Sequence, residues 1–146
     1  MTKHFGGLIL ETAFRVLVPF TLVYGIYVLT HGEFSPGGGF QAGALLAAGI
    51  VLARLIQGRD TAFNIKGEHA VVLAGFGTFI YALTGFLPLF FGGNFLDYSY
   101  LPFPAEELHE LHAMGILMIE IGVTICVMMT IIDILDVVTE RADIDD

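Results

Sequence analysis

Charged residues are scarce in this sequence, and their scarcity argues against a soluble domain. Only 14% of the 146 residues are charged, whereas 55% are hydrophobic. The apolar residues collect into long blocks instead of recurring at amphipathic spacing, so each block needs lipid or protein on every side. No internal repeat or low-complexity linker separates the blocks. The composition is therefore typical of a protein that lies mostly within a membrane.

Cysteine is also nearly absent. The single cysteine, Cys126, falls inside the last apolar block, and one thiol permits neither an internal disulfide nor a CxxC metal motif. The run HELH, from His109 to His112, brings ligand-type side chains together, but its spacing differs from the HExxH of zinc enzymes. We therefore expect no metal, no cofactor and no redox chemistry in this chain.

Four apolar stretches are long enough, or nearly so, to cross a bilayer. A helix rises about 1.5 Å per residue, so roughly 20 apolar residues cross a hydrocarbon core of about 30 Å. The four stretches are Leu8 to Leu29, Phe40 to Ile56, Ala70 to Phe91 and Leu111 to Ile132. The sequence therefore predicts an all-α, multi-pass protein of the cell membrane, in which residues 1–146 form a single four-transmembrane-helix bundle.

The basic residues are distributed unevenly among the segments outside these stretches. Residues 31–39 and 92–107 contain no lysine or arginine. All six basic residues lie elsewhere, at Lys3, Arg15, Arg54, Arg59, Lys66 and Arg141. By the positive-inside rule, the base-containing segments face the cytoplasm and the two base-free loops face outside. This asymmetry predicts an N-in, C-in topology.

The most specific local sequence is HGEFSPGGGFQAG, which runs from His31 to Gly43. Three consecutive glycines lose much conformational entropy on folding, so their presence indicates a backbone with positive φ or a very close approach to other atoms. Pro36 restricts the chain as it enters this run. No GK[ST] follows, so a nucleotide phosphate site is not indicated. From chemistry alone, a tight turn with solvated amides explains the run.

The segment PGGGFQAG also resembles a known family. Placed after one apolar stretch and before Ala44 to Ala53 and two further stretches, it is similar to the MnhB/MrpB family. That family provides the small four-helix subunit of Mrp-type multisubunit sodium/proton antiporters, with related subunits in the membrane arms of energy-converting hydrogenases and sulfur reductases. The family commonly has Gly-Gly where this chain has Ala42-Gly43. The resemblance assigns turn or packing roles, and no ion ligands, to Pro36, Gly37, Gly38, Gly39, Phe40 and Gly43.

Glu120 is the strongest candidate for a place on an ion path. It lies between Ile119 and Ile121, deep in the fourth stretch, where an ionisable side chain costs roughly 2.5 to 3.5 kcal/mol to insert. On a helix, it projects within roughly 20° of His109, which would align a relay. Its apolar neighbours favour a neutral carboxyl that could exchange a proton. Alternatively, Glu120 is a hydrogen-bonded anchor that fastens this helix to a neighbour.

The other acids near the apolar stretches have simpler explanations, although Glu11 and Arg15 remain ion-path candidates. These two residues are four apart with the acid first, the favourable order for a helical ion pair. We expect them to neutralise each other near the cytoplasmic side. Asp133 and Asp136 follow the fourth stretch, where we expect them to be solvated or paired with a base of another subunit.

Small residues at every fourth position form two stripes. Such stripes let two helix backbones approach closely in lipid, and we expect some of these faces to pack on other subunits. One stripe is Gly39, Gly43 and Ala47, and the other is Ala70, Ala74, Thr78 and Ala82.

No lysine lies within the four stretches, so we do not expect this chain to be the main proton pump of an antiporter. The resemblance implies a subunit of a sodium/proton-translocating complex that helps to line or seal a cation path and is not an enzyme by itself. Its partners would be other integral membrane subunits, the lipid bilayer, Na⁺ and H⁺, with no nucleic acid. Two alternatives remain open: a purely structural assembly subunit, and a self-contained four-helix exporter.

The predicted topology can be tested by labelling single cysteines with a membrane-impermeant maleimide. With Cys126 replaced by serine, Ser35→Cys should react only from outside and Arg59→Cys only from the cytoplasmic side, because the two loops lie on opposite sides of the membrane. Reaction of both from one side would show that the span count or the orientation is wrong.

Overall fold

Four long helices make up most of the computed structural model, which describes residues 7–32, 37–57, 65 and 67–144. The helices are α1 (Gly7–Thr30), α2 (Gly39–Gln57), α3 (Gly67–Phe90) and α4 (Leu108–Ile144), and a 3-10 turn, η2 (Tyr98–Tyr100), precedes α4. All four are long and apolar enough to cross a membrane. The predicted class, an all-α protein with four transmembrane helices, is therefore confirmed.

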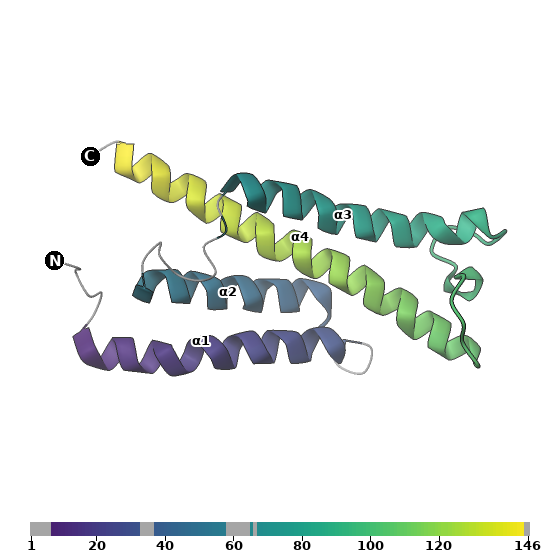
Figure 1. Ribbon diagram of the computed structural model, residues 1–146, viewed down its shortest axis with the longest axis horizontal. Coiled ribbons are helices and arrows are strands. Elements are labelled where there is room, and N and C mark those ends of the chain that lie inside the picture. The colour runs from purple at the N-terminus through teal and green to yellow at the C-terminus, as the bar shows by residue number, and fades with distance from the viewer. Residues whose placement is uncertain (1–6, 33–36, 58–64, 66, 145–146) are drawn as a thin grey trace.

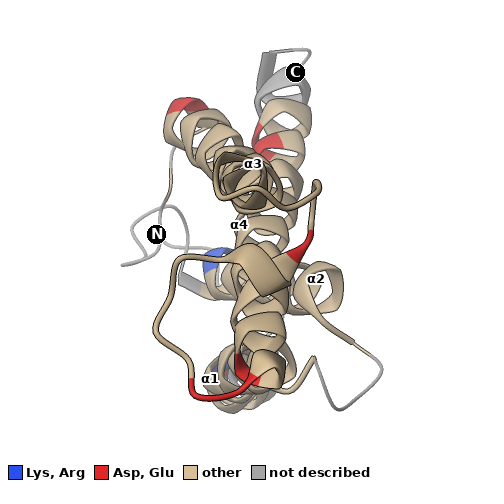
Figure 2. Cartoon of the chain, turned by 90° about the vertical axis from the view of Figure 1, so that its right-hand side faces the viewer, with Lys and Arg blue, Asp and Glu red and all other residues tan. Residues whose placement is uncertain are grey.

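The helices form a row rather than a closed bundle. α1 packs on α2, α2 packs on α4, and α4 packs on α3, so α4 separates α3 from the α1–α2 hairpin (Figures 1 and 2). The N-terminal end of α1 and the C-terminal end of α4 lie at the same end of the molecule (Figure 1). A row leaves broad apolar faces uncovered, as at Phe20 in α1, which is 71% exposed.

The α3–α4 contact depends on two glycines that face each other. A Cβ at Gly77 would lie 2.6 Å from the carbonyl oxygen of Gly122, and a Cβ at Gly122 would lie 2.8 Å from the carbonyl oxygen of Gly77. No side chain fits at either position without moving a backbone. Because lipid provides no hydrophobic force between helices, such close backbone packing holds α3 against α4.

The loop between α3 and α4 folds back over these two helices. α3 ends in a Schellman motif, in which Gly92 takes a φ of 88° and the N–H of Gly93 donates to the carbonyl of Pro88 at 3.0 Å. The N–H of Leu96 then donates to the carbonyl of Gly85 at 3.1 Å. The ring of Tyr98 covers Gly115 of α4. The end of α3 and the start of α4 are thereby tied together.

An ion pair holds α2 to α4 at the opposite end. Arg54 Nη1 donates to Asp136 Oδ1 at 2.7 Å, and Arg54 Nη2 donates to the carbonyl of Ile65 at the same distance. The expectation that Asp136 is solvated or paired with another subunit is therefore wrong, because the base comes from the chain itself. Ile50 of α2, Ala70 of α3, and Met129 and Ile132 of α4 form the apolar core near this end.

Alanine substitutions at two glycines of α3 should differ in their effects on stability. Gly77→Ala should lower the free energy of unfolding by about 1 to 3 kcal/mol, since its Cβ would strike the α4 backbone. A Cβ at Gly75 meets nothing within 4 Å, so Gly75→Ala should be neutral or stabilising by up to about 1 kcal/mol. Denaturant titration in mixed micelles measures both. Equal effects of the two substitutions would contradict the proposed packing.

Candidate functional site

Glu120 of α4 lies against the glycine turn that connects α1 with α2. A Cβ at Gly32 would collide with both carboxylate oxygens of Glu120, and a Cβ at Gly38 would lie 2.8 Å from Oε1. Gly38 has a φ of 88°, in the left-handed region that favours glycine. The glycine run and the intramembrane acid, which the sequence presents as separate candidates, therefore form a single site.

The backbones of α2 and α4 also meet at this point. A Cβ at Gly39 would collide with the carbonyl oxygen of Glu120, and one at Gly43 would lie 2.8 Å from the carbonyl oxygen of Thr124. Thr124, only 3% exposed, donates its hydroxyl hydrogen to the carbonyl of Gly39 at 3.0 Å. The stripe Gly39, Gly43 and Ala47 is buried within the chain and is therefore not available to other subunits.

The position of Glu120 beside the start of α2 has an electrostatic consequence. The first amides of a helix have no intrahelical acceptor, and the helix dipole places a partial positive charge there. α2 begins at Gly39, directly against Glu120. This end of α2 therefore attracts negative charge, and the Glu120 side chain lies against it.

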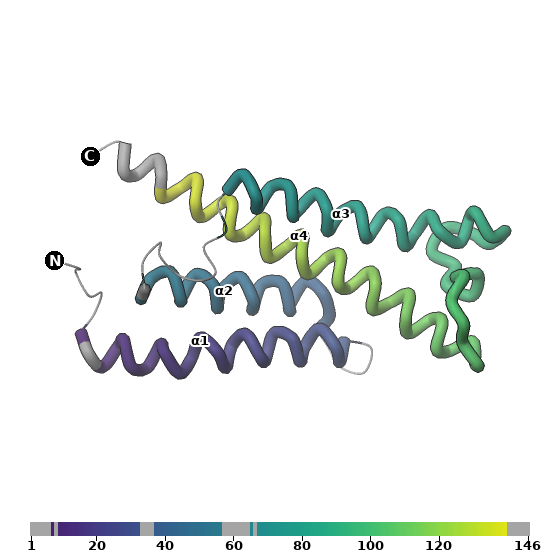
Figure 3. The backbone as a smooth tube through the Cα atoms, viewed as in Figure 1, coloured from purple at the N-terminus to yellow at the C-terminus, as the bar shows by residue number. Residues whose placement is uncertain are grey.

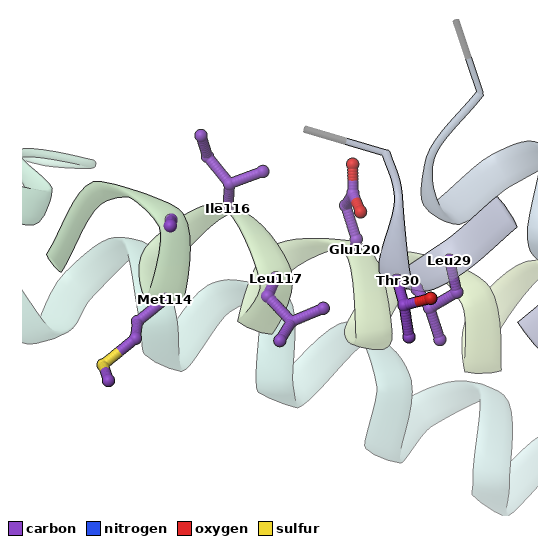
Figure 4. Close-up of a pocket in the computed structure, with 7 residues that line it drawn as sticks. Leu29, Thr30, Met114, Ile116, Leu117 and Glu120 are labelled. Carbon is purple, nitrogen blue, oxygen red and sulfur yellow. The ribbon is translucent and has the colours of Figure 1, made fainter. Parts of the chain in front are cut away.

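A pocket of about 170 Å³ opens beside Glu120 (Figure 4). α1 contributes its last two residues, Leu29 and Thr30, and α4 contributes the other wall. The α4 residues that line the pocket are Ala113, Met114, Ile116, Leu117 and Glu120. Most of the residues that line the pocket are thus apolar, and Glu120 and Thr30 are its polar residues.

The structure does not bring His109 to Glu120. The side chain of His109 is 73% exposed, and its Nδ1 lies 3.1 Å from Glu107 Oε2. The eleven residues between the two positions separate them by about 16 Å along α4, which is too far for direct proton transfer. The alignment expected from the helical period therefore forms no relay within this chain.

Glu11 and Arg15, the other two ion-path candidates, lie apart from Glu120. Arg15 Nη2 donates to Glu11 Oε1 at 2.7 Å, the expected ion pair, at the other end of α1. Gly37 and Phe40 also belong to the HGEFSPGGGFQAG segment, and both are exposed. Pro36, like Ser35 and Arg59, lies outside the described residues.

The histidine-rich start of α4 serves local structure. Ser99 Oγ and His112 Nε2 lie 2.9 Å apart in a hydrogen bond. Within the part of the chain that the structure describes, no three His, Cys, Asp or Glu side chains gather into a group able to hold a metal. Burial raises the pKa of the neighbouring Tyr98 phenol, with a smaller contribution from Tyr81, so that phenol stays protonated at neutral pH.

Sequence reasoning missed three contributors to the Glu120 site. Gly32 and Thr30 precede the glycine run, and only the fold shows that the end of α1 reaches α4. Thr124 had a visible signal, because it follows Glu120 by four residues and must therefore share its helix face.

These features define the class of the protein: a membrane protein of four helices in an open row, whose half-buried acid packs on a glycine turn. The chain belongs to the family described as a domain related to the MnhB subunit of the Na⁺/H⁺ antiporter, whose profile matches residues 9–133. The resemblance noted in the sequence is thereby confirmed.

Bacterial relatives agree with this assignment. A putative antiporter subunit mnhB2 from Staphylococcus haemolyticus is 33% identical over 132 residues, which cover 89% of this chain and 92% of the relative. A Na⁺/H⁺ antiporter subunit from Bacillus subtilis is 29% identical over 133 residues, covering 86% of this chain and 93% of the relative. Such a chain is one subunit of a multisubunit, cation-translocating membrane complex.

A solved structure shares the fold. The chain is similar to one chain of the membrane-bound sulfane sulfur reductase, an archaeal respiratory membrane complex, with a TM-score of 0.70 and 30% identity. The match covers 93% of this chain and 59% of that longer chain.

Two threonines of α4 test the contact with α2. Thr124→Val should lower the free energy of unfolding by roughly 0.6 to 2 kcal/mol, because it removes the interhelical hydrogen bond to the carbonyl of Gly39. Thr130 is the matched control, since its hydroxyl bonds to the carbonyl of Cys126 in the same helix. Thr130→Val should change stability little. A silent Thr124→Val would contradict a stabilising role for this interhelical bond.

Proposed function

We propose that this subunit contributes the Glu120 site to a cation path between subunits of an Mrp-type complex. The observation that supports the proposal most is the close packing of Glu120 against the glycine turn. An ionisable residue within a membrane span is costly and usually faces protein or water, so it marks an ion route by default. Here Glu120 also lies against the backbone at Gly32 and Gly38, two residues that carry no side chain.

The depth of the turn supports the same proposal. Glu120 lies twelve residues inside α4, about 18 Å from its outer end. In Figure 3, α3 and α4 continue well beyond the α1–α2 turn. Non-helical backbone at membrane depth is tolerated only where protein buries it or where it lines a water-filled cavity. The turn therefore belongs next to a neighbouring protein or next to water, and both suit a path between subunits.

In this proposal the chain keeps an N-in, C-in orientation, with the Glu120 site in the outer half of the membrane. Arg54 and Asp136 then lie toward the cytoplasm, where the positive-inside rule places basic residues. We further propose a non-redox role, in which the chain exchanges protons or sodium ions at Glu120 and electron transfer, where a complex performs it, belongs to other subunits.

A purely structural role is the second candidate, and a specific observation favours it. The backbone contact of Gly39 with Glu120 and the bond from Thr124 would hold α2 to α4 whether or not an ion passes. In that case Glu120 serves the fold by accepting hydrogen bonds at the start of α2.

Replacing Glu120 with glutamine separates the two candidates. Gln keeps the volume and the hydrogen-bonding capacity but cannot exchange a proton. On the ion-path proposal, Glu120→Gln should leave the complex assembled and lower sodium/proton exchange by at least about tenfold, since general acid–base groups typically contribute 10²–10⁴-fold. Glu120→Asp should be milder. Exchange in inverted vesicles, normalised to assembled complex, is the measurement.

Glu68 provides the matched control, because it is an exposed acid at the start of α3. Glu68→Gln should leave exchange unchanged. Full exchange activity in the Glu120→Gln complex would reject the ion path and leave the structural role.

A further inference from the structure

α4 is longer than a membrane span requires. The stretch Leu111 to Ile132 alone rises about 33 Å, enough to cross a hydrocarbon core of about 30 Å, and α4 continues to Ile144. A Cβ at Gly67, the first residue of α3, would lie 3.3 Å from Asp133 Oδ1. The last turns of α4 therefore extend past the start of α3 (Figure 1).

Three apolar side chains on this extension form a ridge. Ile134, Val137 and Val138 are 56%, 47% and 60% exposed. Their spacing of three and four residues places them on one face of the helix. We call these three residues the α4 ridge. Exposed apolar side chains that gather on one face mark a contact with a protein or with a membrane.

An ion pair lies at the same level of α4 as the ridge. Arg54 of α2 binds Asp136 there, at 2.7 Å. Charged groups are costly in hydrocarbon, and a full apolar span already precedes this level. The ridge therefore belongs at the edge of the membrane core or beyond it, where lipid tails do not cover it.

The charges near the ridge select its occupant. Residues 133–146 contain six acids and one base, and Arg54 neutralises one of the acids, Asp136. In the proposed orientation this end of α4 faces the cytoplasmic leaflet, whose anionic lipids repel an acidic segment. A second copy of this chain would bring the same acids. A protein segment that carries lysine or arginine is complementary in charge.

We propose that the α4 ridge docks a helix of a neighbouring subunit, one that presents an apolar face flanked by lysine or arginine side chains. The apolar face would cover the ridge, and the basic side chains would meet the acids at this end of α4. From Glu120 to Val138, α4 rises about 27 Å. The inference therefore goes beyond the proposed ion path and does not depend on whether an ion passes at Glu120.

Photocross-linking in the intact complex tests the docked helix. The photoreactive residue p-benzoylphenylalanine, placed at position 134 or 138, should form a cross-link to another subunit. Mass spectrometry should locate the cross-link in a segment that carries lysine or arginine. Thr139 is the matched control position, because it is exposed but lies about 100° around the helix from Val138. The same probe there should give several-fold less of this product.

The identity of the product decides the outcome. Cross-links only to lipid, to this chain, to a second copy of it or to a segment without basic residues overturn the proposal. The absence of a product at both ridge positions, or equal yields at Val138 and Thr139, overturns it as well.

Reversal of one acid tests the charge of the partner. Glu140→Lys should lower the yield of the cross-link from position 138 several-fold, because it replaces attraction with repulsion. Glu106→Lys is the matched control, since it makes the same change of charge at an exposed residue just before the start of α4, at the other end of that helix. It should leave the yield unchanged. Equal yields in the two variants would contradict a basic partner at the α4 ridge.

Discussion

The contact between α2 and α4, called the α2–α4 seam below, determines how the rest of the chain is arranged. It joins the α1–α2 hairpin to the α3–α4 hairpin. Gly39 and Gly43 let the α2 backbone touch the α4 backbone at Glu120 and Thr124. In a bilayer, where lipid competes equally for apolar surface, such contact and the hydrogen bond from Thr124 provide much of the attraction. The Arg54–Asp136 pair closes the other end of the same seam.

A seam of this kind explains why the helices form a row. α2 and α4 each use one face for the seam and another for their own hairpin partner, so α1 and α3 are held on opposite sides (Figure 2). The outer faces of α1 and α3 remain apolar and uncovered, as Phe20 and Phe79 illustrate. An open row offers much more surface to neighbours than a closed bundle would, which suits a subunit of a large membrane complex.

The helices were predictable from sequence because long apolar stretches have few alternatives in lipid. The ion pair of Glu11 with Arg15 was predictable for a similar reason, since it depends only on local helical spacing. The pairing of Arg54 with Asp136 and the meeting of Gly38 with Glu120 were not predictable. Both depend on which helices become neighbours. Stripes of small residues indicate close packing, but they do not identify the helix against which each stripe packs. The proposed relay from His109 failed because angular alignment ignores separation along the axis.

An acid placed at the start of a helix inside a membrane experiences two opposing influences. Apolar residues line the pocket beside Glu120, while the start of α2, the end of a helix that attracts negative charge, lies against this residue. The absence of side chains at Gly32 and Gly38 keeps the Glu120 carboxylate close to the backbone of the turn, and the absence of one at Gly39 lets the α2 backbone approach the α4 backbone at Glu120. The glycines that hold the two hairpins together therefore also shape the surroundings of Glu120, so the structural role and the proposed transport role of this turn depend on the same residues.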